Sequence, residues 1–320
     1  MAVNAGTLVR SSVIGEREDL EDTIYRVAPE ETPFTSNIGK TKVKSVLHEW
    51  QLQSLASPDA NNAQYEGDEI GTHTSPTQPS RVSVFAQIFR KDGSVSGTVQ
   101  SSDRAGRADE MDYQKMIRGI ELRRDMEARM IGNYASVAET PASVTRKTAG
   151  ALAWVATNDS LGSGGSSGGW ASAGVVSAAT NGTQRTFTET LLKGVLVTGF
   201  TNGAKYSQAY MSGTHKQLAS AFTGIADIRS EVKGSGQATI YGAADTYISD
   251  FGPISFIPHP YGLSRDVLLI DPAGWAVGTY RGVMTETLAK NGDNERFMMI
   301  AEKSLIARNE KMGAVIRDLT

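Results

Sequence analysis

The sequence predicts an α+β protein built of separate parts, and three observations carry this expectation. Arg107–Asn133 contains no proline and spaces its apolar residues three and four apart, which predicts a helix of roughly 40 Å. Val43–Ser54 and Arg81–Arg90 alternate apolar and polar residues, as strands with one buried face do. Thr186–Met284 has the pattern of a helix, a strand, a second helix and further strands, which is typical of an α+β domain.

The composition excludes several classes of protein. The 320 residues carry a formal net charge of −3, so there is no overall basic surface of the kind that binds nucleic acid. Cysteine is absent, which excludes disulfides and thiolate chemistry and suits a reducing cytosol. No apolar run is long enough to cross a bilayer, and the N-terminus lacks the apolar core of a signal peptide.

The first forty residues are expected to form an arm. Residues 1–15 are small and polar, and Arg17–Val27 has the spacing of a short helix with acidic residues in its first turn, where the helix dipole favours them. Pro29 ends that helix. We expect Thr32-Pro33-Phe34 to be extended, because the residue before a proline avoids helical geometry, and we expect Pro33 to set the direction of the arm.

The two alternating segments predict a long hairpin. Trp50 lies on the drier face of the first segment, and 26 mostly polar residues, Leu55–Ser80, separate it from the second. A loop of this length is unusual inside a compact domain. An isolated hairpin is marginal in water, so we expect this one to lie on a neighbouring copy. Its tip carries the acidic residues Glu66, Asp68 and Glu69, which could equally be a solvated charge run.

The long helix is densely charged outside its apolar stripe. From Arg107 to Arg129 it has six basic and six acidic residues, so it is neutral although every second residue is ionised. Asp125 and Arg129, four residues apart, are expected to pair and support it. Two interpretations stay open: a solvated helix, or a helix that packs on its own domain along the stripe and meets other subunits with Arg123, Arg124 and Arg129.

The second half of the chain begins with a low-complexity segment. Leu161–Gly169, LGSGGSSGG, is expected to be a flexible surface excursion. Phe187–Phe200 predicts a helix, and Thr214 is expected to cap another helix that ends at Phe222. The strands expected after it are Thr246–Asp250, Gly252–Pro258, Val267–Asp271, Trp275–Thr279, Phe297–Arg308 and Lys311–Arg317.

No catalytic constellation is found in the sequence. Gly164–Gly168 matches the pattern G-x-S-x-G, with Ser166 as its serine, but it lacks the strand before it and the helix after it that would expose a nucleophile. The four histidines are far apart and form no H-x-x-x-H pair, so no metal or other cofactor is predicted. We expect His215 and His259 to be structural.

Several stretches resemble the SU10-type family of tailed-bacteriophage major capsid proteins. GEREDLEDTIYRVAPEETPFTSNIGK, residues 15–40, resembles the family's opening, with an acidic helix, a proline, and then Thr-Pro-Phe and an apolar residue before glycine. LAKNGDNERFMMIAEKSLIARNEKMGAVIRDL, residues 288–319, is similar to its ending. Ser249–Gly252, Leu268–Asp271 and Glu66–Asp68 match at the expected places between, whereas residues 158–185 have no counterpart.

The resemblance implies the Hong Kong 97-like capsid fold. Its implied parts are an N-terminal arm (1–45), an extended E-loop hairpin (46–98), a peripheral domain with the long spine helix (99–157), the glycine/serine-rich excursion (158–185), an axial domain (186–287) and return strands of the peripheral domain (288–320). The last thirty residues are then expected to form a sheet that packs along the apolar stripe of the long helix.

The function implied is that of a major head protein that is not an enzyme. Copies would form hexamers and pentamers and close into an icosahedral shell around double-stranded DNA, bound without sequence specificity, in a virion assembled in the host cytoplasm. Portal, scaffolding and decoration proteins are implied as further partners, and no membrane is. The candidate subunit-contact residues are Pro33, Phe34, Trp50, Glu66, Asp68, Glu69, Arg123, Arg124 and Arg129. An encapsulin-type compartment, a tail tube or sheath protein and a Ser166 hydrolase remain alternatives.

Overall fold

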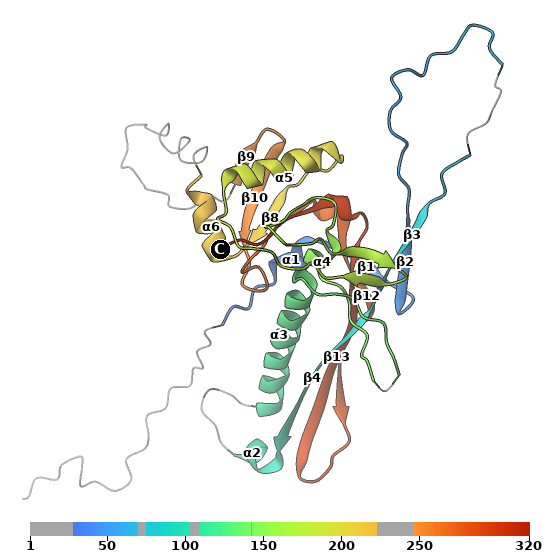
Figure 1. Ribbon diagram of the computed structural model, residues 1–320. Coiled ribbons are helices and arrows are strands. Elements are labelled where there is room, and N and C mark those ends of the chain that lie inside the picture. The colour runs from blue at the N-terminus through green and yellow to red at the C-terminus, as the bar shows by residue number, and fades with distance from the viewer. Residues whose placement is uncertain (1–27, 70–74, 103–105, 107–108, 142, 223–245) are drawn as a thin grey trace, which may run out of the picture.

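Two sheets, one long helix and a projecting loop organise the chain (Figure 1). The computed structural model describes residues 28–69, 75–102, 106, 109–141, 143–222 and 246–320. The helix expected at Arg17–Val27 lies outside the described residues.

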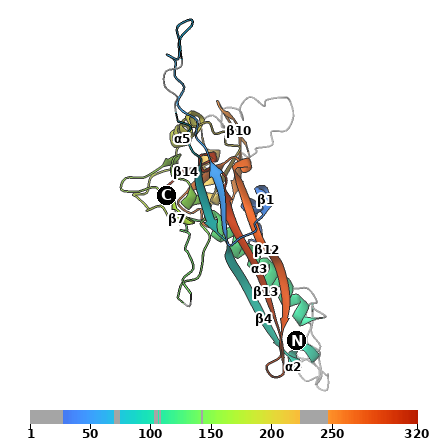
Figure 2. The ribbon, with the colours of Figure 1, turned by 90° about the vertical axis from the view of Figure 1, so that its right-hand side faces the viewer.

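A four-stranded sheet forms the long blade of the molecule (Figure 2). Its order is β1-β12-β13-β4, with β1 parallel to β12 and the other neighbours antiparallel. The strands are β1 (Gly39–Lys42), β12 (Trp275–Leu288), β13 (Asn294–Ala307) and β4 (Gln87–Ser96). β12 continues beyond Thr279, its expected end, because pairing with β13 across two register shifts holds its exposed second half.

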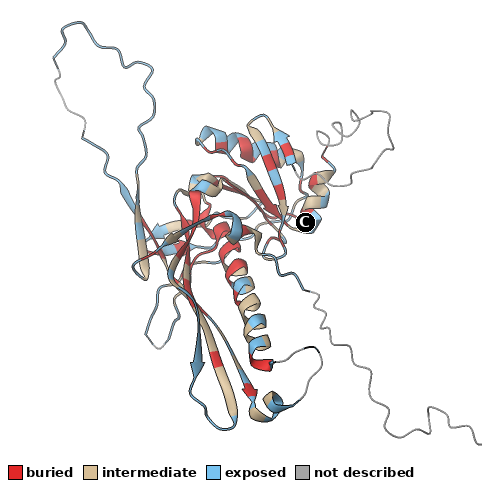
Figure 3. Ribbon diagram, turned by 180° about the vertical axis from the view of Figure 1, so that it is seen from behind, coloured by how far each residue is buried: buried red, intermediate tan, exposed pale blue. Residues whose placement is uncertain are grey.

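The long helix α3 (Glu110–Ile131) lies along one face of this blade, after the short helix α2 (Gly97–Ser101). The Asp109 side chain caps α3 by accepting a hydrogen bond from the backbone N–H of Asp112. The expected packing of the last thirty residues along its stripe is confirmed for β13, but β4 supplies the larger part of that surface. The stripe residues that are buried (Figure 3) are Met111, Leu122, Met126, Met130 and Ile131.

A six-stranded sheet carries the second core. Its order is β5-β14-β11-β8-β10-β9. Helices α5 (Glu189–Thr201) and α6 (Gly213–Ser220) pack their apolar sides on it, with Leu192 and Val195 of α5 and Ala219 of α6 buried there. The strands are β5 (Asp159–Ser160), β14 (Gly313–Ile316), β11 (Val267–Ile270), β8 (Gln208–Met211), β10 (Gly252–Pro258) and β9 (Thr246–Ser249).

The chain crosses between the two sheets more often than the expected ranges allow. β12, within the range 186–287, belongs to the long blade, whereas β14, within 288–320, adds to the six-stranded sheet beside β11. All residues of β11 and β14 are buried. A wholly apolar run indicates that a strand is buried but does not indicate which strand it pairs with. The expected domain boundary at residue 287 therefore does not separate the two sheets.

The expected hairpin forms, but its paired part is short. β2 (Leu47–Leu52) pairs with β3 (Ser80–Phe85), and the described residues between them, 53–69 and 75–79, project from the body in Figure 1. The expected strand Arg81–Arg90 is two strands, because the Ala86 backbone still bonds to Val46 while β4 beyond it pairs with β13. The strand therefore changes partners within one apolar run.

Two local expectations at helix starts are wrong. Thr32-Pro33-Phe34 is not extended throughout, since Pro33 opens the helix α1 (Pro33–Asn37) after a non-helical Thr32. Proline is well tolerated as the first residue of a helix, because the N–H it lacks would have no helical partner there. In α6 the cap is Ser212, which accepts a hydrogen bond from the backbone N–H of His215, and Thr214 is already inside the helix.

The glycine/serine-rich segment, residues 158–185, has a defined structure, contrary to the flexibility expected for its part Leu161–Gly169. After α4 (Ala151–Trp154), it forms β6 (Gly169–Ser172) paired with β7 (Val175–Ser177). Its glycines allow close backbone approach rather than freedom. A Cβ on Gly162 would lie 2.2 Å from the Thr183 carbonyl oxygen, and one on Gly168 would lie 2.4 Å from that of Ser177.

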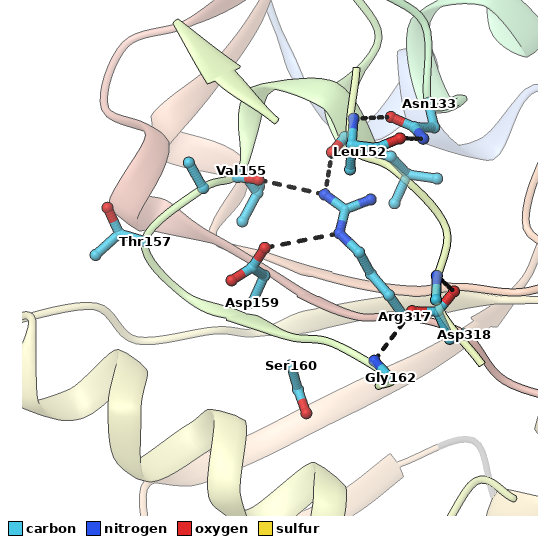
Figure 4. A network of polar contacts seen from close by, with 12 residues as sticks. Asn133, Leu152, Val155, Thr157, Asp159, Ser160, Gly162, Arg317 and Asp318 are labelled. Atoms are coloured by element: carbon cyan, nitrogen blue, oxygen red, sulfur yellow. Dashed lines mark hydrogen bonds and ion pairs between the residues drawn. The ribbon is translucent and has the colours of Figure 1, made fainter. Parts of the chain in front are cut away.

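The C-terminus holds this segment in place (Figure 4). The Asp318 carboxylate accepts hydrogen bonds from the backbone N–H of Gly162 at 3.0 Å and of Gly182 at 2.7 Å. The neighbouring Arg317 is buried and donates to the carbonyls of Leu152 and Val155. The end of the chain thus joins α4 and the glycine/serine-rich segment to the six-stranded sheet, which the composition of the segment alone does not indicate.

Candidate subunit-contact site

The residues that precede and begin α1 are anchored inside the protein. Phe34 is fully buried, with its ring 5.6 Å from that of Tyr210 and 6.5 Å from that of Trp275, both edge-on. Pro33 is the first residue of α1. Phe34, a predicted contact residue, is therefore a core residue of its own chain, and its burial fixes the position of α1 on the body.

A buried carboxylate on α3 holds the backbone of α1. Glu127 accepts hydrogen bonds from the backbone N–H of Phe34 at 2.7 Å and of Thr35 at 2.9 Å, and from the Thr35 hydroxyl at 2.5 Å. His259, in the turn after β10, places its Nε2 atom 2.8 Å from the Glu127 Oε1 atom. Both side chains are fully buried. A buried carboxylate needs such partners, because burial without them would be costly.

Sequence reasoning missed Glu127, although a signal was present. Glu127 lies three residues before Met130 and four before Ile131, so it falls within the apolar stripe of α3 rather than on the charged flanks. An acid in an apolar stripe requires an internal partner. His259, which we expect to be structural, is one of the internal partners of Glu127. Its other ring nitrogen, Nδ1, lies 2.8 Å from the Tyr261 carbonyl oxygen.

The predicted basic strip on α3 is not one surface. The Arg124 Nε atom donates to the Tyr261 hydroxyl at 3.0 Å, and that hydroxyl donates to the Pro29 carbonyl, so Arg124 helps to hold the chain before α1. Arg129 donates to the carbonyls of Thr148 and Ala135. Burial lowers the pKa of Arg129, whose side chain remains charged.

Arg123 is the exposed member of that strip. Asp125 does not pair with Arg129 as expected but with Lys91 of β4 at 2.8 Å, and Glu121 pairs with Arg118 at 2.7 Å. A basic strand residue beside the helix competes with the helical i,i+4 partner, and only the packing of α3 on β4 could reveal it.

Trp50 ties the base of the hairpin to the body. Its indole N–H donates to the Arg308 carbonyl at 3.2 Å, and its ring lies 5.8 Å from that of Trp154. The ring of His48 lies 5.7 Å away on the same face, and burial lowers the pKa of His48. Trp50 is thus a contact within its own chain that sets where the projecting loop starts.

The tip of the loop contacts nothing else in the described chain. Glu66, Asp68 and Glu69 are exposed around a turn in which the Asp68 N–H donates to the Tyr65 carbonyl. Tyr65 is 88% exposed and Leu55, in the same loop, is 95% exposed. An exposed aromatic and an exposed leucine on one projecting loop are unfavourable in water, which favours a surface that becomes covered.

The geometry around Ser166 does not support the alternative of a serine hydrolase. Ser166 sits in a two-residue backbone bridge with Thr180, its N–H donating to the Thr180 carbonyl at 3.1 Å, rather than at a strand-to-helix turn. Within the described ranges, no group of three or more histidine, aspartate or glutamate residues could hold a metal ion. The helices of the described part of the chain include none long and apolar enough to cross a membrane.

The blade with its long helix, the second sheet and the projecting loop together define the Hong Kong 97-like capsid fold. The chain is similar to one in the capsid asymmetric unit of cyanophage A-1(L), with a TM-score of 0.65 and 12% identity over 97% of this chain and 98% of that one. It is also similar to the holo-SrpI encapsulin complex from Synechococcus elongatus, with a TM-score of 0.54 and 11% identity over 97% and 94%. At such identities the likeness concerns the fold alone.

The chain belongs to the SU10 major capsid protein family, whose model matches residues 3–320. A curated relative, the major capsid protein of Escherichia phage Phieco32, is 33% identical over 122 residues. That match spans 38% of this chain and 34% of the relative, about a third of its length. The family is thus one of structural capsid proteins.

Proposed function

We propose that this chain is the major head protein of a tailed phage, and that its copies form hexamers and pentamers which close into an icosahedral shell around double-stranded DNA. The observation that carries the proposal is the projecting stretch 53–69 of the hairpin loop, in which Leu55 and Tyr65 are exposed. Such a loop contributes nothing to its own core, and a neighbouring copy would cover it. Family membership and fold support the same function.

The proposed mechanism is cooperative burial across many weak contacts. Each copy lays its loop and its N-terminal arm over neighbours, and each single interface stays weak enough for errors in assembly to dissolve. Many such contacts in a closed shell then add through multivalency. The formal charge of −3 fits a container that does not grip its DNA tightly, because phosphate binding grows with the number of lysines and arginines that contact it. Portal, scaffolding and decoration proteins are further proposed partners.

Electron microscopy of the full-length chain after expression tests this function. Closed shells are the expected result. Shells that enclose a protein cargo instead of DNA would favour an encapsulin-type compartment, which the likeness to the Synechococcus elongatus complex makes the second candidate. Rods would identify a tail tube or sheath protein, and labelling of Ser166 by a fluorophosphonate probe would identify a hydrolase. Monodisperse monomers under all conditions would contradict every shell function.

The acidic tip is proposed to set the register between neighbouring copies. We predict that Glu66→Lys with Asp68→Lys leaves the subunit folded but impairs shell formation at low salt, because the exposed carboxylates would no longer meet a basic surface. Each exposed ion pair is worth about 0–1 kcal/mol, so the defect concerns register more than strength and fades as salt rises. The measurement is the yield of closed shells against salt concentration.

Asp59→Lys provides the matched control for this prediction. Asp59 is an exposed acid of the same loop, outside the acidic cluster, and its carboxylate caps only the local backbone N–H of Asn61. Its reversal changes the loop's charge in the same sense and should leave assembly unchanged. Normal shells from the double variant at low salt would show that the acidic tip does not set the register between neighbouring copies.

A further inference from the structure

A cleft of about 220 Å³ opens between α1, α3 and the blade. Three cations from three different elements line it: Lys40 from β1, Arg123 from α3 and Lys303 from β13. The hydroxyl-bearing residues Thr32, Ser36 and Thr279 also line it, and the Thr32 and Ser36 hydroxyls lie 3.5 Å from each other. Glutamate and aspartate are absent among the residues that line it, so the lining offers hydrogen-bond donors and positive charge with no compensating carboxylate.

The three cations are uncompensated in the described part of the chain. The other described cations on and beside α3 have partners: Lys115 pairs with Asp112, Arg118 with Glu121, and Lys91 with Asp125. Within the same described ranges, no ion pair reaches the three cations that line the cleft. Burial, and after it the charge of Lys40, lower the pKa of Lys303 below its ordinary value, so the two lysines repel each other across the cleft.

We infer that this cleft binds a phosphate group, free or carried by a nucleic-acid backbone. Three positive charges and several hydroxyl donors around one small space suit an acceptor-only anion with more than one negative oxygen. A single carboxylate would leave most of the charge unbalanced. The cleft also provides a local use for cations in a chain whose overall charge is slightly negative. The inference goes beyond the proposed shell function and does not depend on it.

Titration of the full-length chain with inorganic phosphate, followed by ³¹P NMR and by thermal unfolding, tests this site. Saturable binding and a rise in Tm are expected for the native chain. Lys303→Met and Arg123→Gln should each weaken binding about tenfold or more, since each removes a charge-assisted hydrogen bond. Lys303→Met should also raise the Tm measured without phosphate, because it removes an uncompensated, half-buried charge, so loss of binding would not reflect misfolding.

Matched controls and competing anions sharpen the outcome. Lys115→Met and Arg118→Gln remove paired cations of α3 outside the cleft and should leave phosphate binding unchanged. A single-stranded oligonucleotide that competes with phosphate would identify nucleic acid as the source, whereas binding of inorganic phosphate alone would identify free phosphate. Acetate that binds as well as phosphate at equal ionic strength would overturn the assignment in favour of a carboxylate, such as that of a loop tip from a second copy. Phosphate binding that does not saturate would also overturn it.

Discussion

Replacing Glu127 with alanine is expected to lower the free energy of unfolding by about 3 kcal/mol and to prevent shell formation. The substitution leaves the buried Phe34 N–H, the part-buried Thr35 N–H and the buried His259 without their acceptor. Unpaired buried donors cost about 1–3 kcal/mol each, less whatever water enters the space. Because α1 directly follows the proposed N-terminal arm, loss of these bonds would free the start of α1 even in molecules that stay folded.

Two further variants distinguish the effect of the hydrogen bonds of Glu127 from the effect of removing a negative charge from α3. Glu127→Gln keeps the shape, but its amide nitrogen would face a donor, so an intermediate loss is expected. Glu121→Gln is the matched control: it is an acid on the same helix, part-exposed and paired with Arg118, and its loss should stay within about 1 kcal/mol. Urea denaturation of the full-length chain gives the free energies, and electron microscopy scores the shells. An equal loss of unfolding free energy in Glu127→Gln and Glu121→Gln would show that the bonds of Glu127 to α1 do not stabilise the protein.

Replacing Asp318 with alanine is expected to cost about 3 kcal/mol and to release the glycine/serine-rich segment from the body. The carboxylate accepts from the Gly162 and Gly182 N–H groups and from Arg265, whose Nη2 atom lies 3.2 Å away. Asp318 also has a φ of 60°, which aspartate and asparagine tolerate better than alanine does. Its side chain is 1% exposed, so water cannot replace these bonds without opening the structure.

Hydrogen exchange locates the effect of the Asp318 variants. The amides of Gly162 and Gly182 should lose protection in Asp318→Ala, whereas the amides of α5, the helix that packs on the six-stranded sheet, should keep it. Asp318→Asn retains the backbone conformation and one acceptor, so it should fall between the native chain and the alanine variant. Unchanged protection at both glycines in Asp318→Ala would contradict the role assigned to the C-terminus.

Many features followed from local patterns in the sequence. The proline-free run and its apolar stripe predicted α3 within a few residues of its ends, and strict alternation predicted the pairing segment of the hairpin. The polar run between β2 and β3 predicted a projecting loop, and the described residues 53–69 and 75–79 between these strands belong to such a loop. These features depend on neighbours in the sequence or on the period of a single element, so the residues themselves carry the information.

The candidate contact residues show where local reasoning stops. Phe34, Trp50, Arg124 and Arg129 have the composition of interface residues, yet the structure uses all four inside one chain. The acidic tip is exposed as expected, and its partner on a neighbour stays a prediction. An aromatic ring or a guanidinium reads the same in a sequence whether its partner lies in its own core or on another copy.

The sequence by itself determined the kinds of parts: an α+β chain with a long amphipathic helix, a projecting hairpin loop and motifs of a capsid family. Only the tertiary structure decided how they join. It places β12 in the blade and β14 in the other sheet. It brings Glu127 within hydrogen-bond distance of α1. It also packs the glycine/serine-rich segment closely, with Asp318 bonded to its backbone. Each of these depends on contacts between residues far apart in the chain, whose partners no local period or composition specifies.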